Sequence, residues 1–278
     1  LIPVIFQLFY KEFNSTFIIS SIITVIFGIL FFLSNIDHQK TINTQQAFLL
    51  TALSWISIAI FGSIPFIFSE LKLSVTDAFF ESMSGITTTG STIISNIETT
   101  PKAILIWRAM LQWLGGIGII LMAITLMPIM NIGGMQLLKI SGNDTSEKIL
   151  PKSKQISLRL IIIYLVLTFS CALFYKISGM NYFDSLSHAM TTISTGGFSN
   201  YDQSIGYFNN PKIETVSIIF ILLGSIPFIS YIKFISGNKK IIFNDEQIKL
   251  FFKMIVISVF ILFVYLAIVN QNIFEISI

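Results

Sequence analysis

The sequence predicts an all-α polytopic membrane protein built from repeated helix–pore loop–helix units. Hydrophobic residues make up 54% of the 278-residue chain and charged residues only 11%, whereas a soluble domain carries about 25% charged residues. Long apolar runs recur along the chain, and a short polar hairpin occurs twice between them. The composition therefore excludes an ordinary soluble domain, and the recurring hairpin predicts the internal architecture.

Six apolar runs are long enough to cross a hydrocarbon layer of roughly 30 Å. They cover residues 17–33, 46–68, 104–130, 156–177, 213–235 and 250–269. Residues 1–9 are also apolar but too few to span, so we expect them to be the end of a truncated helix. Eleven of the 17 Lys and Arg residues lie in segments 34–45, 131–159 and 233–253, which the positive-inside rule places in the cytoplasm.

A segment with a helix start and a glycine-bearing turn occurs twice. One copy begins at Ser74 and the other at Asn181, each an N-cap residue followed three positions later by Asp. This pattern predicts a capping box and a short helix. Thirteen residues after each Asp stands a glycine, Gly90 or Gly197, in a run of Thr, Ser and Gly that is too polar and flexible to continue the helix.

These hairpins, with helices expected over 74–86 and 181–193, have the length and chemistry of an ion-selectivity filter. A helix of about a dozen residues is roughly 18 Å long, or half a bilayer. Extended backbone at membrane depth is tolerated only where it lines a polar pathway. The runs 87–90 and 194–197 combine small hydroxyl residues with glycines that can turn carbonyls inward, as in the filters of potassium channels. The units are therefore predicted to be of the potassium-channel type.

The spans after the two hairpins begin alike. Pro101 and Pro211 each follow polar residues and are expected at the first helical position, where the missing N–H costs nothing. Matching caps, glycines and prolines indicate an internal repeat, and two unrelated amphipathic loops are the alternative. A membrane enzyme is not expected, because the sequence has no His-Glu-x-x-His or Gly-x-Ser-x-Gly motif and no paired intramembrane aspartates apart from the caps.

Several stretches resemble the pore-forming subunits of the Trk/Ktr superfamily of bacterial potassium transporters, of the TrkH type. They are residues 77–92, 107–120, 133–137 and 188–199, with 202–208 extending the last. The resemblance covers nearly the whole chain. It implies potassium uptake across the bacterial inner membrane by four helix–pore loop–helix repeats around one pore, preceded by two extra helices. It also implies a homodimer and a cytosolic nucleotide-binding regulatory subunit of the TrkA type, with potassium as the transported ion, no bound cofactor and no nucleic acid.

The resemblance also assigns roles to individual residues and segments. The potassium-coordinating backbone carbonyls would belong to Thr88, Thr89, Thr195 and Gly196. The residues supporting the filter would be Thr87, Gly90, Ser194 and Gly197. The segments would be a truncated N-terminal transmembrane hairpin (1–45), a first repeat (46–130), a cytosolic linker (131–155), a second repeat (156–235), and a linker with the first helix of a truncated third repeat (236–278). Because only two filters are present, a non-conducting truncated remnant and a sodium-permeable relative are the alternatives.

One basic residue near the start of an apolar run invites two interpretations. Arg108 lies deep enough in the run over 104–130 to be costly unless it is paired or near the interface. It either snorkels to the membrane surface or forms an ion pair with Glu81 or Asp77 that braces the first pore helix. We favour the brace with Glu81.

Overall fold

A computed structural model describes residues 2–12, 14–34, 36, 43–130, 149–237 and 244–276, with side chains described outside 44, 123–130, 149–154 and 270–276. The chain divides into two units, Leu1–Ser225 and Ile226–Ile278. The described residues contain helices and no strand, which confirms the predicted all-α class. Most of the cytosolic linker expected over 131–155 lies outside the described residues, and the limits of the repeats stay a prediction.

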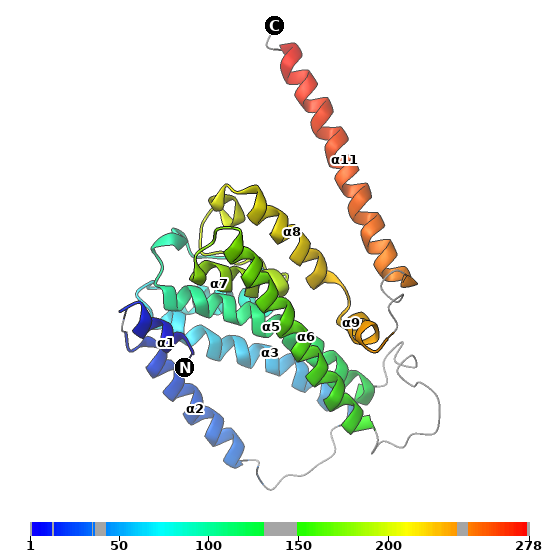
Figure 1. The fold of residues 1–278 in the computed structure, drawn as a ribbon. Coiled ribbons are helices and arrows are strands. Elements are labelled where there is room, and N and C mark those ends of the chain that lie inside the picture. The colour runs from blue at the N-terminus through cyan, green and yellow to red at the C-terminus, as the bar shows by residue number, and fades with distance from the viewer. Residues whose placement is uncertain are drawn as a thin grey trace. The chain divides into compact units, whose positions relative to one another are not determined.

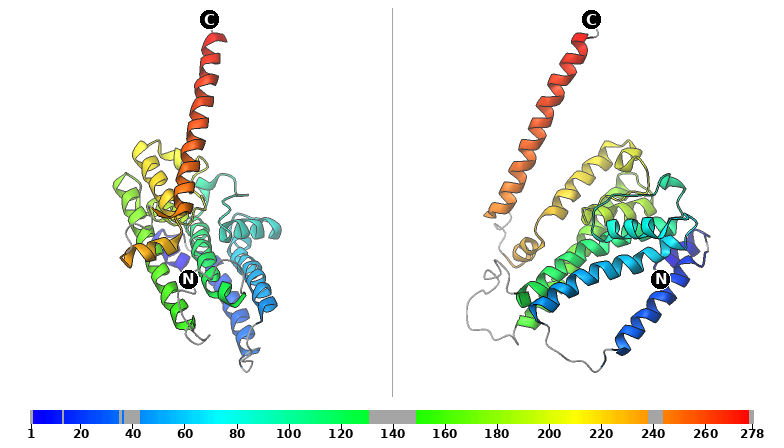
Figure 2. Two further views of the ribbon diagram at one scale, coloured as in Figure 1. Left: turned by 90° about the vertical axis from the view of Figure 1, so that its right-hand side faces the viewer. Right: turned by 180° about the vertical axis from the view of Figure 1, so that it is seen from behind.

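The first unit contains eight α-helices and two short 3-10 helices among its described residues (Figure 1). The elements are α1 (Ile2–Phe9), α2 (Thr16–Ser34), α3 (Thr44–Ile67), α4 (Val75–Ile86), η1 (Ile97–Thr99), α5 (Lys102–Met130), α6 (Ile149–Ile177), α7 (Tyr182–Ile193), η4 (Ser204–Phe208) and α8 (Pro211–Ser225). The long helices α2, α3, α5 and α6 lie side by side in chain order (Figure 2). The short helices α4 and α7 both pack against α5, α4 also against α3, and α7 also against α6 and α8.

The second unit contains α9 (Phe228–Ile235) and α11 (Glu246–Ile276). The apolar run over 213–235, predicted to be long enough to span the membrane, forms two helices in the structure. Helix α8 ends at Ser225, and α9 begins after Pro227. Proline lacks a backbone N–H and disfavours helical backbone at the residue before it, here Ile226, so a helix readily ends at this point.

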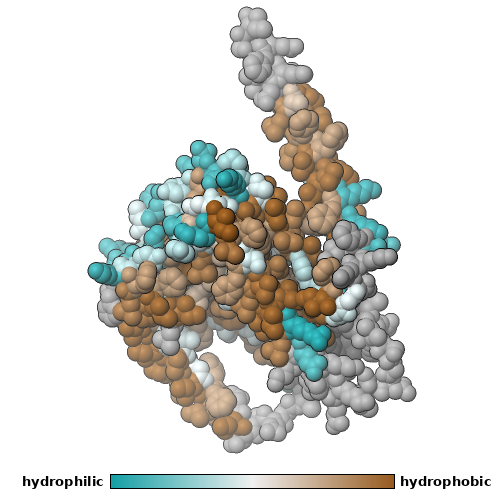
Figure 3. All heavy atoms as spheres, in the orientation of Figure 1, coloured by the Kyte–Doolittle hydropathy of each residue, from teal (hydrophilic) through white to brown (hydrophobic). Residues whose placement is uncertain are grey.

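Five helical segments in the described part of the chain are long and apolar enough to cross a membrane, and six if α8 and α9 form one broken span. The five are Thr16–Ser34, Gln45–Ile67, Lys102–Met122, Gln155–Ile177 and Glu246–Val269. Their outer surfaces are apolar. On the face shown in Figure 3, hydrophobic residues make up most of the visible surface of the long helices of the first unit, and hydrophilic residues gather near α7 and the loops before α8. An apolar belt below a polar end is what a lipid-embedded unit requires.

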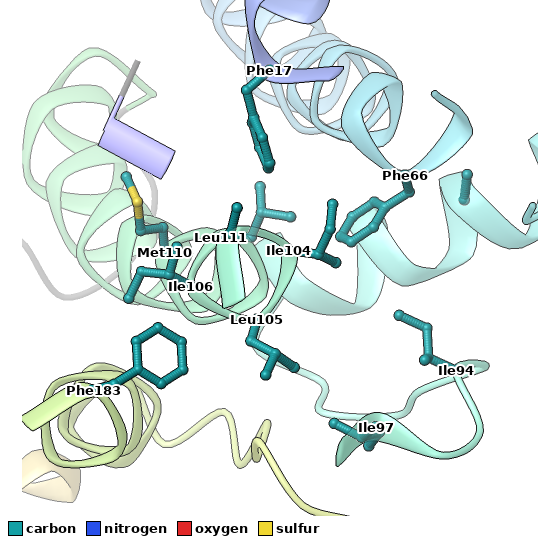
Figure 4. Close-up of a cluster of buried hydrophobic side chains, with 12 residues drawn as sticks. Phe17, Phe66, Ile94, Ile97, Ile104, Leu105, Ile106, Met110, Leu111 and Phe183 are labelled. Atoms are coloured by element: carbon teal, nitrogen blue, oxygen red, sulfur yellow. The ribbon is translucent and has the colours of Figure 1, made fainter. Parts of the chain in front are cut away.

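Helix α5 forms the centre of the first unit. Its residues Leu105, Ile106 and Leu111 are almost fully buried, and Phe66 of α3 and Phe183 of α7 belong to the same apolar cluster (Figure 4). Half of the apolar, membrane-spanning stretch of α5 is buried, compared with 22% of that of α3. A central helix of this kind holds both short helices in place, because α4 and α7 pack against it.

Candidate functional site

The first hairpin (74–92) and the second hairpin (181–199) correspond residue by residue, with each position of the second numbered 107 higher. Both contain a 12-residue helix, α4 or α7. The side chains of the N-cap residues Ser74 and Asn181 accept the backbone N–H of Asp77 and Asp184, at 3.1 and 2.8 Å. The predicted helix starts and ends are therefore confirmed.

The predicted capping box is only half formed in each hairpin. Its second half would be a carboxylate accepting the backbone N–H of the N-cap residue. Instead, the Ser74 hydroxyl donates to Asp77 Oδ2 at 2.8 Å, and the Asn181 amide donates to Asp184 Oδ2 at 2.6 Å. The carboxylate thus holds the side chain of the N-cap residue in place of its backbone.

The chain leaves both helices through the same unusual backbone. Thr88 and Thr195 have φ of 55° and 54°, and Gly90 and Gly197 have φ of 83° and 81°. A left-handed conformation is ordinary for glycine but strained for a β-branched residue. Strain at matching positions is maintained only where the surrounding structure imposes it, and it concentrates at functional sites.

The candidate filters, 87–90 and 194–197, direct their amide groups back toward the short helices. The N–H of Thr89 donates to the Ser84 carbonyl, and the N–H of Gly196 donates to the Thr191 carbonyl, both at 2.9 Å. Among the described residues, no donor reaches the carbonyl oxygens of the predicted coordinating residues. These are Thr88, Thr89, Thr195 and Gly196. Unpaired carbonyls are the groups that a dehydrated cation requires.

The two candidate filters touch each other. A Cβ atom on Gly90 would overlap the carbonyl oxygen of Gly196, so only glycine fits at this point of contact. Beside the second candidate filter lies a cavity of about 230 Å³, and Thr195, Gly196 and Gly197 are among the residues that line it. The structure therefore brings together residues that are more than 100 positions apart in the chain.

Arg108 and Glu81 form a buried ion pair. Arg108 Nε lies 2.7 Å from Glu81 Oε1, and the side chains are 1% and 0% exposed. Glu81 also accepts the Thr92 hydroxyl and the backbone N–H of Ile93, each at 3.0 Å. Arg108 therefore does not snorkel to the surface, and the pair ties α5 to α4 and to the segment that leads away from the first candidate filter.

The same arginine reaches the second hairpin. Arg108 Nη1 donates to the Ser199 carbonyl at 3.0 Å, and the guanidinium lies 4.3 Å from the centre of the Phe198 ring. Both contacts fall just after the second candidate filter. One cation on α5 thus fixes the return segments of both hairpins, a role that pairing with Glu81 alone did not predict.

The second hairpin has a neutral counterpart of the first hairpin's ion pair. His188, 107 positions after Glu81, contacts the Asp184 carbonyl through Nδ1 at 2.9 Å and the Ser199 hydroxyl through Nε2 at 3.1 Å. A carbonyl can only accept, so Nδ1 carries the proton and Nε2 accepts from Ser199. The bond to Ser199 joins α7 to its return segment, and the bond to the Asp184 carbonyl within α7 holds the imidazole in place.

The Asp184 carboxylate collects further donors from the loop that follows. It is 1% exposed and accepts Asn200 Nδ2 at 2.8 Å and the Tyr201 hydroxyl at 2.7 Å, in addition to Asn181. Burial and the bond to this carboxylate raise the pKa of Tyr201. Asp184 is thus the centre of a polar network, more than the helix cap that the sequence predicted.

Glycines allow the following helices to reach the end of each short helix. A Cβ on Gly115 of α5 would overlap the Ile86 carbonyl, and a Cβ on Gly224 of α8 would lie 2.9 Å from the Ile193 carbonyl. Ile86 and Ile193 are the last residues of α4 and α7. The matching contacts give both hairpins the same support at the point where the candidate filters begin.

Comparison with known proteins agrees with this repeated architecture. A family model described as TrkH, cation transport protein, matches residues 14–275. The chain belongs to the TrkH family of cation transport proteins. This TrkH-family chain is a multi-pass protein of the bacterial inner membrane.

The matches to individual relatives cover most of this TrkH-family chain, but the chain spans only about half the length of each relative. The Trk system potassium uptake protein TrkI of Halomonas elongata is 42% identical over 73% of the chain and 42% of its own length. TrkH of Escherichia coli K12 is 36% identical over 99% of the chain and 60% of its own length. The crystal structure of the potassium transporter TrkH from Vibrio parahaemolyticus superposes with a TM-score of 0.81 at 33% identity, over 92% of this chain and 53% of that one.

Reasoning from sequence missed Gln112 altogether, and for Thr88 and Thr195, which it did select, it missed the left-handed backbone. Gln112 lies between the candidate filters, and the left-handed threonines precede the filter glycines. Gln112 stands four residues, about one turn, after Arg108 on the same helix, so its position on the Arg108 face was a usable signal. No sequence signal marks Thr88 or Thr195 as left-handed, because threonine disfavours that conformation. Within the described ranges, no group of three or more His, Cys, Asp or Glu side chains could hold a metal ion.

Proposed function

We propose that this protein takes up potassium through a pore to which the two hairpins contribute carbonyl oxygens. The observation that carries the proposal is the repeated turn at matching positions, with left-handed threonine and glycine and unpaired carbonyls. Alternation of left-handed and ordinary residues aligns successive peptide groups, so that their N–H groups face one side and their carbonyls the other. The N–H groups of Thr89 and Gly196 do face the short helices, which supports carbonyls directed into a pathway.

We propose potassium and not sodium as the transported ion, because the relatives described above are named potassium uptake proteins or a potassium transporter. Thr88, Thr89, Thr195 and Gly196 are the proposed ligands, each through its backbone carbonyl. The C-terminal ends of α4 and α7 add a partial negative charge beside the ion. The limits of the repeats, the homodimer and the cytosolic regulatory subunit of the TrkA type are part of the same proposal. The homodimer and the subunit rest on the family resemblance alone.

The test is growth of a potassium-uptake-deficient bacterium that expresses the protein. We expect wild-type protein to restore growth at low external potassium, and Gly90→Ser and Gly197→Ser to raise the concentration required. Gly118→Ser is the matched control, because Gly118 lies on α5 and a Cβ there would meet open space. Wild-type growth by both filter variants, at equal amounts in the membrane, would contradict the filter assignment.

A further inference from the structure

The amide of Gln112 lies at the junction of the two candidate filters. Gln112 belongs to α5 and is fully buried. Its Oε1 accepts the backbone N–H of Phe198 at 3.0 Å, directly after Gly197. A Cβ on Gly196 would lie 2.5 Å from Oε1 and 2.8 Å from Nε2, so the amide packs flat against that glycine.

The orientation of the amide follows from its partner. Only the carbonyl oxygen of glutamine can accept the N–H of Phe198, so the NH₂ group points the other way. Nε2 lies 3.8 Å from the position that a Cβ on Gly90 would occupy. It is buried, and no acceptor among the described residues pairs with it. The side chain therefore contacts one candidate filter and reaches the edge of the other.

Through Gln112, the predicted first repeat holds the backbone of the candidate filter in the predicted second repeat. Gln112 comes from the helix that follows the first hairpin, yet its hydrogen bond holds the backbone just beyond Gly197. Gly196, whose carbonyl is a proposed ligand, lies between this amide on one side and Gly90 on the other. A change in the amide would let the Gly196 carbonyl move relative to the first candidate filter.

We propose that Gln112 is a positioning residue that sets the spacing between the carbonyls of the two candidate filters and so contributes to discrimination between potassium and sodium. The inference rests on the proposed function. Selectivity in carbonyl filters depends on the size of the site and on the number of oxygens around the ion. Loss of the bond to Phe198 therefore weakens discrimination before it abolishes uptake.

The experiment measures uptake of potassium and of sodium by cells or vesicles that contain the intact protein. Gln112→Met keeps the length of the side chain and removes both polar groups. We expect it to lower the preference for potassium over sodium about tenfold, the factor that corresponds to about 1.4 kcal/mol of lost hydrogen-bond free energy.

The matched control is Thr168→Val. Thr168 accepts the indole N–H of Trp113, the residue after Gln112, at 3.0 Å. This variant therefore also removes one partly buried hydrogen bond to α5, but Thr168 does not belong to a candidate filter. It should leave the potassium-to-sodium ratio unchanged. If Gln112→Met does not reach the membrane, Gln112→Asn should show the same loss, because it is one methylene too short to reach Phe198.

Each outcome has one meaning. An unchanged ratio in Gln112→Met overturns the positioning role, and so does an equal loss in Thr168→Val. Absence of potassium uptake by the wild-type protein would instead overturn the proposed function, and it is measured separately, before any variant is compared.

Discussion

The two hairpins reach the same backbone geometry with different chemistry. The first is braced by a buried charge pair, Arg108 with Glu81, while at the matching position of the second stands the imidazole of His188 with two hydrogen bonds. The Asp residues in the first turns of α4 and α7 show the opposite difference, because the second hairpin has the more strongly bonded carboxylate. Asp77 is half-buried and accepts one side-chain donor, while Asp184 is buried and accepts three.

The comparison indicates that the turn is conserved within the molecule and its support is not. Left-handed threonine and glycine occur at the same two positions in both hairpins, so this backbone is the shared requirement. Each hairpin stabilises it with one buried carboxylate, placed on the second turn of α4 in the first hairpin and on the first turn of α7 in the second. Variants at each carboxylate or its partners therefore test how differently the two hairpins are supported.

The largest effect is expected from Arg108→Gln. It leaves the Glu81 carboxylate buried without its cation, which costs roughly 3–5 kcal/mol for a fully buried pair. We expect a lower midpoint of thermal unfolding in detergent and reduced uptake. Glu81→Gln in the same protein should partly restore both, since it removes the unpaired charge. A double variant no more stable than Arg108→Gln alone would show that the pair does not act as a unit.

The next largest effect is expected from Asp184→Asn, which removes the buried carboxylate that supports the second hairpin. It removes the charge that accepts Asn181, Asn200 and Tyr201, and hydrogen bonds to charged groups contribute about 1.5–3 kcal/mol each. We expect a loss near 3 kcal/mol, because the asparagine oxygen still accepts one donor. Asp77→Asn is the control and should cost less than about 1 kcal/mol, the contribution of a charge that solvent reaches at a helix N-terminus. Equal losses in thermal stability would remove the distinction between the hairpins.

Much of this site could be predicted from the sequence because its signals are local. Ser74 and Asn181 start the short helices through bonds to residues three positions away, and the thirteen-residue interval to each glycine fixes where the turn falls. The pairing of Arg108 with Glu81 was also predictable, since an arginine in an apolar span needs an acid within reach.

The remainder depends on contacts between distant segments. Asn200 and Tyr201 meet Asp184 only because the return segment folds back over α7, and Gln112 meets Phe198 across 86 positions. The left-handed threonines contradict local preference, so packing must impose them. The break between α8 and α9 is a different case. Pro227 marked it in the sequence, and the apolar composition on both sides concealed it.

A third comparison separates the two filter glycines. Gly90→Ala and Gly197→Ala both place a side chain in left-handed backbone, which costs about 1–2 kcal/mol. Only the Gly90 variant also forces a Cβ against the Gly196 carbonyl, while the position beside Gly197 is open. We therefore expect a larger loss of thermal stability and a larger rise in the half-saturating potassium concentration for Gly90→Ala. A larger effect at Gly197 would show that contact between the candidate filters is unimportant.

The smallest effect is expected at the caps, where the hairpins are most alike. Ser74→Ala removes the acceptor for the Asp77 N–H and a solvent-exposed donor to the Asp77 carboxylate, and loss of an N-cap side chain typically costs about 1 kcal/mol. Asn181→Ala removes the same bond and also a donor to the buried Asp184, so it should cost about 2 kcal/mol. Asn43→Ala, at the N-cap of α3, serves as the control. It should lower thermal stability by about as much as Ser74→Ala. It should leave the half-saturating potassium concentration unchanged. If Ser74→Ala destabilises the protein more than Asn181→Ala, the stronger support of α7 by Asp184 is refuted, because the two caps then differ in a way that their hydrogen bonds do not explain.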